Sequence, residues 1–394
     1  MNKYNFETIP NRKGKSTIKW DAKHINARFH TNLKENDEYY PMFIADLDFQ
    51  LPDEVLEHMH SKYLVPDFGY FDIPDSFYDA IINWHHLKHQ CDLEKEWIVP
   101  TCGTVTSLHI LSNIYGKDKN FLIFTPVYRQ FKACTDMGKM FTSPLIYRER
   151  QYDIDFDDLE NKLKHDKIDV IIFCNPHNPG GRSWTYGELL RLVNLCKEYN
   201  VLLISDEIHA DICLSERNFI SLMNFSDIYD NIVVATSPNK TFSISGLSTS
   251  YILCRNPKIR KAYVDYVNAM HLSPNRVGIE MIEMVYRYGQ EWHSEMQKVV
   301  KANVEEVIDC LEPLGIEVMV PDSGYLVWIK VNDKVDVDKF IEELAINESV
   351  LLETGSRFID DYDGFIRINV GTSPRIVKEA MKRLAKLYRK YIEV

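Results

Sequence analysis

Long hydrophobic runs are missing from this sequence of 394 residues. Even its longest apolar runs, such as Val201–Ile204, are far shorter than the about 20 consecutive apolar residues that a transmembrane helix needs. The opening residues MNKYNF also lack the apolar core of a secretion signal. We therefore expect a cytoplasmic protein with no membrane partner.

An excess of basic residues is also missing. The chain has 46 lysines and arginines against 58 aspartates and glutamates, for a net charge of −12. Nucleic-acid binding draws on a surplus of positive charge to offset phosphate repulsion. We therefore expect no nucleic-acid partner.

Closely spaced cysteine pairs are absent as well. The eight cysteines are scattered without a CxxC motif, and some, such as Cys174 and Cys254, lie in apolar runs. His85, His86 and His89 crowd one predicted helix, but no cysteine or carboxylate pattern accompanies them. Free, mostly buried thiols in a reducing compartment are the expectation, with no metal site.

What is present is the pattern of a globular α/β protein. Hydrophobic residues make up 45% and charged residues 26% of the chain. Short, unbroken apolar runs alternate with amphipathic helical segments such as Gly187–Glu198. Strands covered on both faces have this unbroken apolar character, so the rhythm predicts a largely parallel sheet. The predicted strands are Phe121–Phe124, Val170–Cys174, Val201–Ser205, Ile232–Thr236, Ser250–Cys254, Tyr325–Lys330 and Phe365–Val370.

The pattern changes in the last third of the chain. One long helical stretch is predicted from about Glu280 to Leu314, followed by a few strands and a closing helix at Pro374–Tyr391. We predict a large α/β domain over residues 46–282. Residues 1–45 together with residues 283–394 are predicted to form a smaller α+β domain.

Polar segments follow two of the predicted strands, at the edge where parallel sheets bind ligands. In the segment NPHNPGGR (175–182), turn residues hold Asn178 on both sides, so that its amide has a fixed direction; an ordinary connector is the alternative. In SDEIHAD (205–211), Asp206 directly follows a buried strand, and a buried carboxylate needs a positive partner. A protonated cofactor ring nitrogen is such a partner, and a helix-capping aspartate is the alternative.

A third segment, SPNKTFSISG (237–246), follows the predicted strand Ile232–Thr236. It places Lys240 among small residues just beyond a buried strand. Burial favours the neutral amine that Schiff-base chemistry requires. A solvated surface lysine is the alternative.

Taken together, these segments resemble fold type I enzymes that depend on pyridoxal 5′-phosphate (PLP), in the class I/II aminotransferase superfamily. Within it the chain is most similar to the cystathionine β-lyase and cystalysin-type C–S lyases. The resemblance covers nearly the whole chain. It rests on eight motifs that occur in the order NR…KWD, ADLDF, FGY, TPVY, NPHNPGGR, SDEIHAD, KTF…GL and RIN.

The resemblance implies roles for the residues that bind the cofactor ring. Lys240 matches the Schiff-base lysine, which also moves protons once substrate is bound. Asp206 matches the carboxylate that keeps the pyridine nitrogen protonated. Asn178 matches the amide that binds the phenolic oxygen, and His209 lies where aminotransferases often have a tyrosine near that oxygen. Tyr128 matches the aromatic residue that stacks on the ring.

The resemblance also implies a phosphate site. Gly103, Thr104 and Val105 open a predicted helix, and backbone N–H groups at a helix start suit an anion; an ordinary helix cap is the alternative. Ser237 matches a phosphate-binding hydroxyl. Tyr70 matches a tyrosine that reaches the phosphate from the neighbouring subunit, which implies a homodimer with shared active sites. A core or surface tyrosine is the alternative.

Arg367 is a charge inside the apolar strand FIRIN and is expected to meet an anion. The resemblance identifies this anion as the substrate α-carboxylate, and a structural salt bridge is the alternative. Two departures stand out. Ser248 occupies the position where many aminotransferases carry a phosphate-binding arginine, and the C–S lyases commonly lack this arginine too. Arg129 follows Tyr128 and either contacts phosphate or substrate or faces solvent.

These residues imply a β-C–S lyase acting on sulfur amino acids, with pyruvate, ammonia and a thiol as products. An aminotransferase acting on an L-amino acid is the alternative, because both reactions begin with loss of the Cα proton. A non-catalytic regulator on the same fold comes next. The chain leaves no room for an additional N-terminal DNA-binding domain and retains Lys240, Asp206 and Asn178 together, which disfavours that function.

Overall fold

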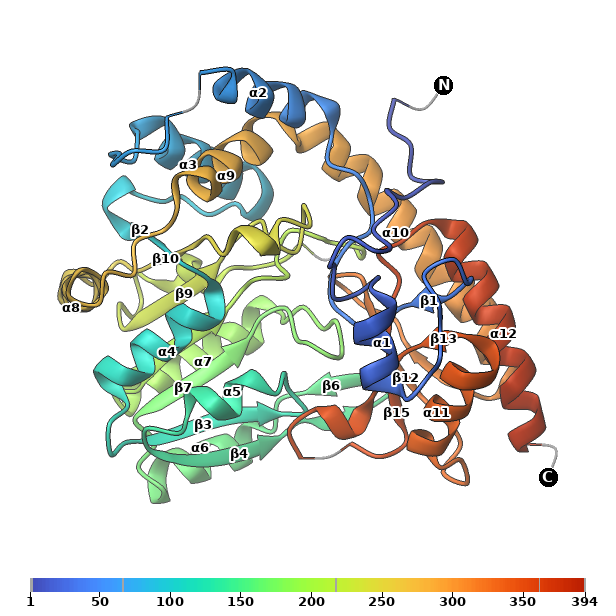
Figure 1. Cartoon of the computed structure of the whole chain (residues 1–394). Coiled ribbons are helices and arrows are strands. Elements are labelled where there is room, and N and C mark those ends of the chain that lie inside the picture. The colour runs from blue at the N-terminus through green and yellow to red at the C-terminus, as the bar shows by residue number, and fades with distance from the viewer. Residues whose placement is uncertain (1–2, 66, 217, 361, 393–394) are drawn as a thin grey trace.

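The computed structural model describes residues 3–65, 67–216, 218–360 and 362–392, and its largest element is a seven-stranded sheet (Figure 1). The strand order is β2–β10–β9–β8–β7–β3–β4, and β10 alone runs against its neighbours. The predicted α/β class with a mostly parallel sheet is therefore confirmed. The strands are β2 (Ile98–Thr101), β3 (Asn120–Thr125), β4 (Lys139–Pro144), β7 (Val170–Cys174), β8 (Leu202–Asp206), β9 (Ile232–Thr236) and β10 (Ser250–Leu253).

The central strands are apolar throughout because both faces of the sheet are covered. In β7, Val170 and Ile172 join one hydrophobic cluster, whereas Ile171 and Phe173 join the other. Successive side chains of a strand point to opposite faces, so each face needs its own apolar set. The helices that cover one face are α4 (Thr104–Tyr115), α5 (Gln130–Cys134) and α8 (Pro257–Ala269).

The other face packs against α3 (Asp75–His89), α6 (Phe156–His165) and α7 (Tyr186–Glu198). Helix α7 starts with a capping box. The Thr185 side chain accepts the backbone N–H of Glu188, and the Glu188 side chain accepts the backbone N–H of Thr185, so two N–H groups that the helix leaves free are bound. Two further helices lie toward the top of Figure 1: α9 (Arg276–Tyr288) packs against α3, and α2 (Asp53–Tyr63) packs against α9.

A second region combines both ends of the chain, blue and red in Figure 1. Its antiparallel sheet has the order β11–β12–β15–β14, and β1 pairs in parallel with β13. The first 45 residues therefore lie against the last third of the chain. The remaining strands are β1 (Tyr40–Pro41), β5 (Ile146–Arg148), β6 (Gln151–Asp153), β11 (Glu317–Met319), β12 (Leu326–Lys330), β13 (Val350–Leu351), β14 (Glu353–Thr354) and β15 (Phe365–Asn369). The remaining helices are α1 (Ala22–Phe29), α10 (Gln290–Leu311), α11 (Val337–Glu348) and α12 (Pro374–Ile392). The predicted domain boundary at 282/283 falls within α9 and stays a prediction.

The prediction of a single long helix from Glu280 to Leu314 is wrong. The structure divides it into α9 and α10 at Gly289 and ends it in a short 3₁₀ turn at Glu312–Leu314. A side chain at position 289 would collide with the carbonyl oxygen of Val285 and lie 2.5 Å from the ring of Phe242. The glycine thus allows two helices of different direction to meet where a larger residue has no space.

All eight cysteines are free, and five of them are buried. The crowded histidines bind separate partners: His85 meets the Tyr251 hydroxyl, His86 meets Asp92 and His89 meets Asp211. No group of His, Cys, Asp and Glu that could hold a metal ion occurs among the described residues. Every described helix is also too short or too polar to cross a bilayer.

Candidate active site

A cavity of about 450 Å³ lies at the carboxyl end of the large sheet. Loops that follow β2, β3, β7, β8 and β9 reach it from one side, and residues from both ends of the chain close it from the other. The position matches the expectation that ligands of open parallel sheets bind beyond the strand ends. The lining residues are Arg28, Phe43, Ile44, Ala45, Cys102, Gly103, Thr104, Val105, Thr106, Tyr128, Cys174, Asn178, Asp206, Ile208, His209, Asn239, Lys240, Ser245, Ser248, Glu353 and Arg367.

Lys240 lies four residues beyond β9, and its amine is directed into this cavity. Its Nζ donates a hydrogen bond to the carbonyl oxygen of Ala45 at 2.6 Å. Burial lowers the pKa of the amine, and the positive charge of Arg367 adds to this effect, while Asp46 and Asp206 oppose it. The amine therefore has access to its nucleophilic neutral form.

Asp206 ends β8 and lines the same cavity. Burial raises the pKa of its carboxyl to about 6, and one backbone N–H, that of Ile208, donates to its Oδ1 at 3.2 Å. The next residue differs: Glu207 receives hydrogen bonds from Ser221 Oγ and from Leu222 N. Glu207 is thus satisfied by its own fold, whereas Asp206 has capacity for a cationic partner in the cavity.

Arg367 lies on β15 and is joined to Asn178, which follows β7. Its Nη1 donates to Asn178 Oδ1 at 3.0 Å, and its Nη2 donates to the carbonyl oxygen of Phe43 at 2.9 Å. Its buried Nε has no hydrogen-bond partner among the described residues. The guanidinium is therefore fixed in direction with a donor still available, an arrangement suited to a carboxylate.

Tyr128 and His209 supply the aromatic surfaces of the cavity. Tyr128 follows β3 and is partly exposed. Burial lowers the pKa of His209 to about 3, with Lys240 and Arg367 acting in the same direction, so its imidazole is neutral. The Nδ1 atom of His209 is buried and has no hydrogen-bond partner in the described part of the chain.

The start of α4 forms the end of the cavity nearest β2. Gly103 has φ +123°, a conformation that only glycine adopts without strain, and its N–H donates to Ser250 Oγ at 3.0 Å. The buried Oγ1 of Thr104 has no described partner. The backbone N–H groups of Thr104 and Val105 belong to the first turn of the helix and are not used by the helix itself. This corner therefore offers donors to an anion.

Three of the predicted site residues lie outside the lining of the cavity. Tyr70 and Arg129 are exposed on the surface. Ser237 is buried just beyond β9, where its Oγ accepts the N–H of Asn239 at 3.1 Å. The predicted roles of Tyr70 and Ser237 stay predictions.

Sequence reasoning missed the residues that reach the cavity from the two ends of the chain. Arg28 of α1 and Glu353 of β14 form an ion pair at 2.7 Å although they are 325 positions apart. The loop Phe43–Ala45 supplies the carbonyl groups that Arg367 and Lys240 bind. No periodicity or short motif links such distant segments, so the sequence held no signal for their meeting.

The N-terminal motif residues hold that loop in place. Lys19 Nζ and Trp20 Nε1 donate to the two carboxylate oxygens of the buried Asp48, at 2.9 and 2.7 Å. Arg12 contacts Asp46 at 3.3 Å, and Ser243 Oγ donates to the same carboxylate at 2.9 Å. The N-terminal segment therefore tethers the loop that contacts Lys240.

The cavity fits PLP. A buried amine and a buried acid line one space, together with a tyrosine ring for stacking and the unpartnered Oγ1 of Thr104 beside the free amides of a helix start. These are the groups that an aldehyde, a pyridine nitrogen, an aromatic ring and a phosphate require.

Comparison with known proteins agrees with this fit. A family model for aminotransferase class I and II matches residues 46–384. Cystathionine beta-lyase PatB of Bacillus subtilis (strain 168) is 29% identical over 388 residues, which cover 96% of this chain and 98% of that protein.

Solved structures give the same picture. Cystalysin from Treponema denticola, which contains PLP, superimposes with a TM-score of 0.91 at 26% identity, covering 98% of this chain and 99% of that one. A PLP-bound C–S lyase from Staphylococcus hominis, complexed with the inhibitor L-cycloserine, gives 0.89 at 29% identity and covers 98% of both chains.

Proposed function

Because the chain belongs to the aminotransferase class I and II family and its cofactor is PLP, we propose that it is a β-C–S lyase acting on sulfur amino acids. The observation that carries the proposal is the single cavity in which Lys240, Asp206 and Arg367 meet. The similarity to cystathionine beta-lyase PatB, cystalysin and a C–S lyase over almost the entire chain supports this reaction among those of the family.

In this proposal, each residue performs one task. PLP, when bound, takes up the electron pair that remains at Cα after proton loss. Lys240 holds the cofactor at rest and removes the Cα proton as a general base. Asp206 retains the positive charge on the ring nitrogen, and Arg367 binds the α-carboxylate, which fixes the Cα–H bond toward Lys240.

The other residues that line the cavity would hold the cofactor. Asn178 and His209 would bind the phenolic oxygen, Tyr128 would stack on the ring, and Gly103 with the amides of Thr104 and Val105 would bind the phosphate. When the Cα proton has left, the Cβ–S bond breaks and the sulfur departs as a thiolate. Hydrolysis of the remaining fragment gives pyruvate and ammonia, so one water enters for each thiol released.

An aminotransferase is the second candidate, because the family includes this activity and the same residues remove the Cα proton. The two reactions differ in whether Cβ loses its substituent or the proton returns to the cofactor. Ser248 lines the cavity at the position where many aminotransferases have arginine, which favours the lyase.

A product assay tests the proposal. We expect L-cystathionine, L-cysteine and related thioethers to yield pyruvate and free thiol in equal amounts. The Lys240→Ala variant should lose both the visible absorbance of the bound cofactor and the elimination activity. Conversion of the cofactor to its pyridoxamine form by an amino acid, without pyruvate or thiol, would select the aminotransferase instead.

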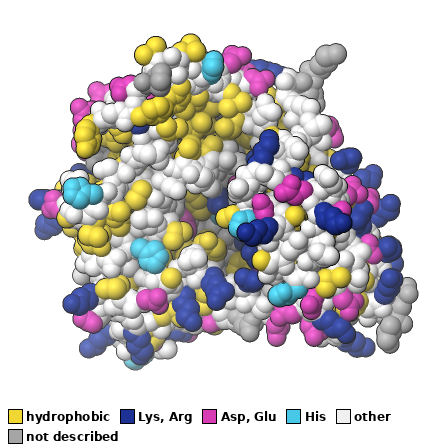
Figure 2. Space-filling model, viewed as in Figure 1, with side chains coloured by type: hydrophobic (Ala, Val, Ile, Leu, Met, Phe, Trp, Pro, Cys, Tyr) yellow, Lys and Arg dark blue, Asp and Glu magenta, His cyan; other side chains and the backbone are white. Residues whose placement is uncertain are grey.

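We propose further that two copies of the chain share their active sites. Tyr70 is fully exposed beside the exposed apolar side chains of Leu64, Val65 and Phe68. In Figure 2, hydrophobic side chains gather over the top of the molecule, where α2 and α9 lie in Figure 1. An apolar surface of this kind is typical of a protein interface.

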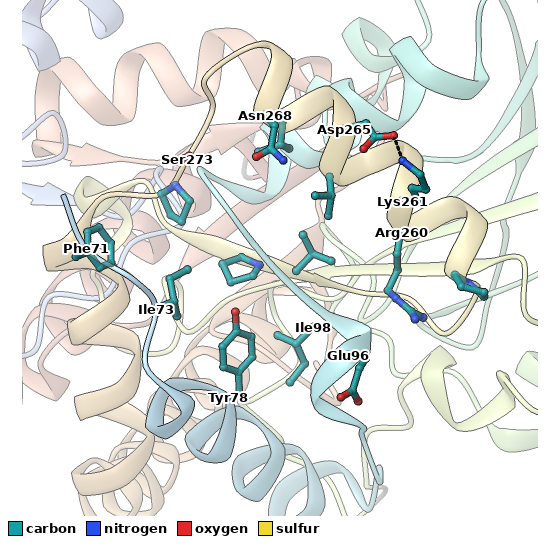
Figure 3. Close-up of a pocket in the computed structure, with 16 residues that line it drawn as sticks. Phe71, Ile73, Tyr78, Glu96, Ile98, Arg260, Lys261, Asp265, Asn268 and Ser273 are labelled. Atoms are coloured by element: carbon teal, nitrogen blue, oxygen red, sulfur yellow. Dashed lines mark hydrogen bonds and ion pairs between the residues drawn. The ribbon is translucent and has the colours of Figure 1, made fainter.

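A hollow of about 670 Å³ adjoins this surface. In Figure 3, Phe71, Ile73, Tyr78 and Ile98 lie around it, and Arg260 and Lys261 of α8 lie at its other end. Its apolar lining, close in sequence to Tyr70, supports a partner that covers this face. A second copy placed there brings Tyr70 toward the phosphate end of the neighbouring cavity, as the family resemblance implies.

A further inference from the structure

One carboxylate in the cavity is surrounded by three guanidinium groups. Arg28 Nη2 contacts both oxygens of Glu353 at 2.7 Å. Arg357 approaches the same carboxylate at 3.8 Å, and Arg367 at 4.0 Å. This cluster therefore has three positive charges for one negative charge, and the imbalance favours anionic ligands.

The substrate α-carboxylate accounts for only one of the two surplus charges. It is assigned to Arg367, which lines the cavity and whose side chain is 6% exposed. Arg28 also lines the cavity, and its side chain is 26% exposed. Arg357 is more exposed and is not among the described lining residues. Arg28 is thus the second cation that a bound molecule can reach.

The geometry of Arg28 leaves part of its guanidinium free for a ligand. Among the described residues, its hydrogen bonds run from Nη2 alone, so Nη1 and Nε remain available. The guanidinium lies 4.6 Å from the centre of the Phe43 ring. Since Arg367 binds the carbonyl oxygen of the same Phe43, both arginines are held at a fixed separation by one residue.

We propose that Arg28 is the specificity-determining residue of the site and selects amino acids whose side chain carries a second carboxylate. Arg367 binds the α-carboxylate deep in the cavity, and Arg28 binds the side-chain carboxylate near its mouth. Glu353 holds Arg28 in place, and it faces any ammonium group attached beside that second carboxylate. This inference rests on the proposed lyase function and narrows its substrates to acidic thioether amino acids.

The test compares one thioether that has the second carboxylate with one that lacks it. In Arg28→Gln, kcat/KM for L-cystathionine should fall by roughly tenfold or more, as expected for one lost hydrogen bond between charged groups, with little change for S-ethyl-L-cysteine. Arg28→Lys should recover part of the loss because it restores the charge. Arg357→Gln is the matched control, since it also loses a contact to Glu353 but is not expected to touch substrate.

A purely structural role for Arg28, in which its ion pair with Glu353 only links α1 to β14, predicts a different result. Both substrates would then lose activity equally in Arg28→Gln, or neither would, and each of these outcomes overturns the proposal. An effect of Arg357→Gln on L-cystathionine as large as that of Arg28→Gln overturns it as well.

A binding measurement separates this inference from the lyase function itself. Calorimetry with the holoenzyme should find tighter binding of suberate, whose carboxylates are separated by six chain atoms as in L-cystathionine, than of heptanoate, and Arg28→Gln should abolish the difference. If no substrate is eliminated, the lyase proposal fails and this measurement alone decides the role of Arg28. Equal affinities for the two acids in the wild-type enzyme, or a difference that persists in the variant, overturn that role.

Discussion

Burial acts on individual ionisable side chains of the cavity in opposite directions. It lowers the pKa of the Lys240 amine and raises the pKa of the Asp206 carboxyl to about 6. Without a charged ligand beside them, the protonation equilibria of both groups are thereby shifted toward the neutral forms. A neutral amine is ready to accept a proton, and the acid ionises when a positive ring nitrogen lies beside it. One physical cause thus prepares two residues for different tasks.

Buried histidines make the stability of the protein depend on pH. Burial lowers the pKa of His85 to about 3, whereas a histidine in an unfolded chain titrates at about 6.5. Below about pH 6.5 the unfolded chain therefore binds a proton that the folded protein does not. The contribution of His85 to stability is complete above this pH and is lost as the pH falls, by about 1.4 kcal/mol per pH unit.

His85→Gln should therefore weaken the pH dependence of unfolding. The amide can still reach the Tyr251 hydroxyl that His85 Nε2 meets at 2.9 Å. Between about pH 7 and about pH 5, the variant should lose roughly 2 kcal/mol less unfolding free energy than the wild type. Urea unfolding of the apoenzyme measures this difference. His24→Gln, at an exposed position, is the control, and an equal effect of both substitutions would contradict the argument.

At the scale of elements, the junction between α9 and α10 depends on one glycine. We expect Gly289→Ala to destabilise the protein by roughly 1–3 kcal/mol, because the added methyl group collides with Val285 and with the Phe242 ring. Phe242 lies two residues from Lys240, so the strain is passed to the lysine loop. The thermal unfolding midpoint of the variant should fall.

Gly187→Ala is the opposite case and serves as the control. Gly187 lies in α7, and an added methyl group there meets nothing within 4 Å. Alanine at such a helical position should stabilise the protein by about 0.4–1 kcal/mol. If both glycine substitutions lower the unfolding midpoint equally, the close approach at Gly289 is not the cause.

The central strands could be predicted from the sequence because coverage on both faces makes them uniformly apolar. Val170–Cys174 and Ile232–Thr236 were predicted with the bounds that the structure has. The edge strand β4 (Lys139–Pro144) could not be predicted, since Thr142 and Ser143 limit its apolar run to Met140 and Phe141. The break at Gly289 was missed because a lone glycine in an amphipathic stretch is compatible with a continuous helix.

The candidate site, like the fold, could be predicted only in part from the sequence. Asp206 ends a strand, and Asn178 and Lys240 each lie four residues beyond one. Parallel strands bring their carboxyl ends to one edge, so local sequence was enough to predict that these residues meet. Arg28 and Glu353 come from other layers of the fold. Their approach depends on the packing of α1 against α11 and of α11 against β14, which no local pattern encodes.

At the scale of the whole molecule, the proposed dimer predicts that two inactive variants restore each other. Tyr70→Ala and Lys240→Ala should each have little activity. Subunit exchange between them creates heterodimers. In each heterodimer one site combines the intact Lys240 of one chain with the intact Tyr70 of the other, and the second site lacks both. The mixture should reach about a quarter of wild-type activity, because half of the dimers are mixed.

The activity of the mixture, followed over time, measures this restoration. Sedimentation of each variant provides the control, since both must remain dimeric before mixing. Activity that stays at the average of the two separate variants would show that Tyr70 does not act across subunits.

The bond between Arg367 and the carbonyl oxygen of Phe43 joins residues 324 positions apart. A ribosome that adds about 5–20 residues per second needs roughly 16–65 s to travel between them. During this interval the early loop is already outside the ribosome, while the strand that holds it has yet to be made. Capture of the vitamin B6 cofactor in its final geometry therefore follows synthesis of the strand that carries Arg367.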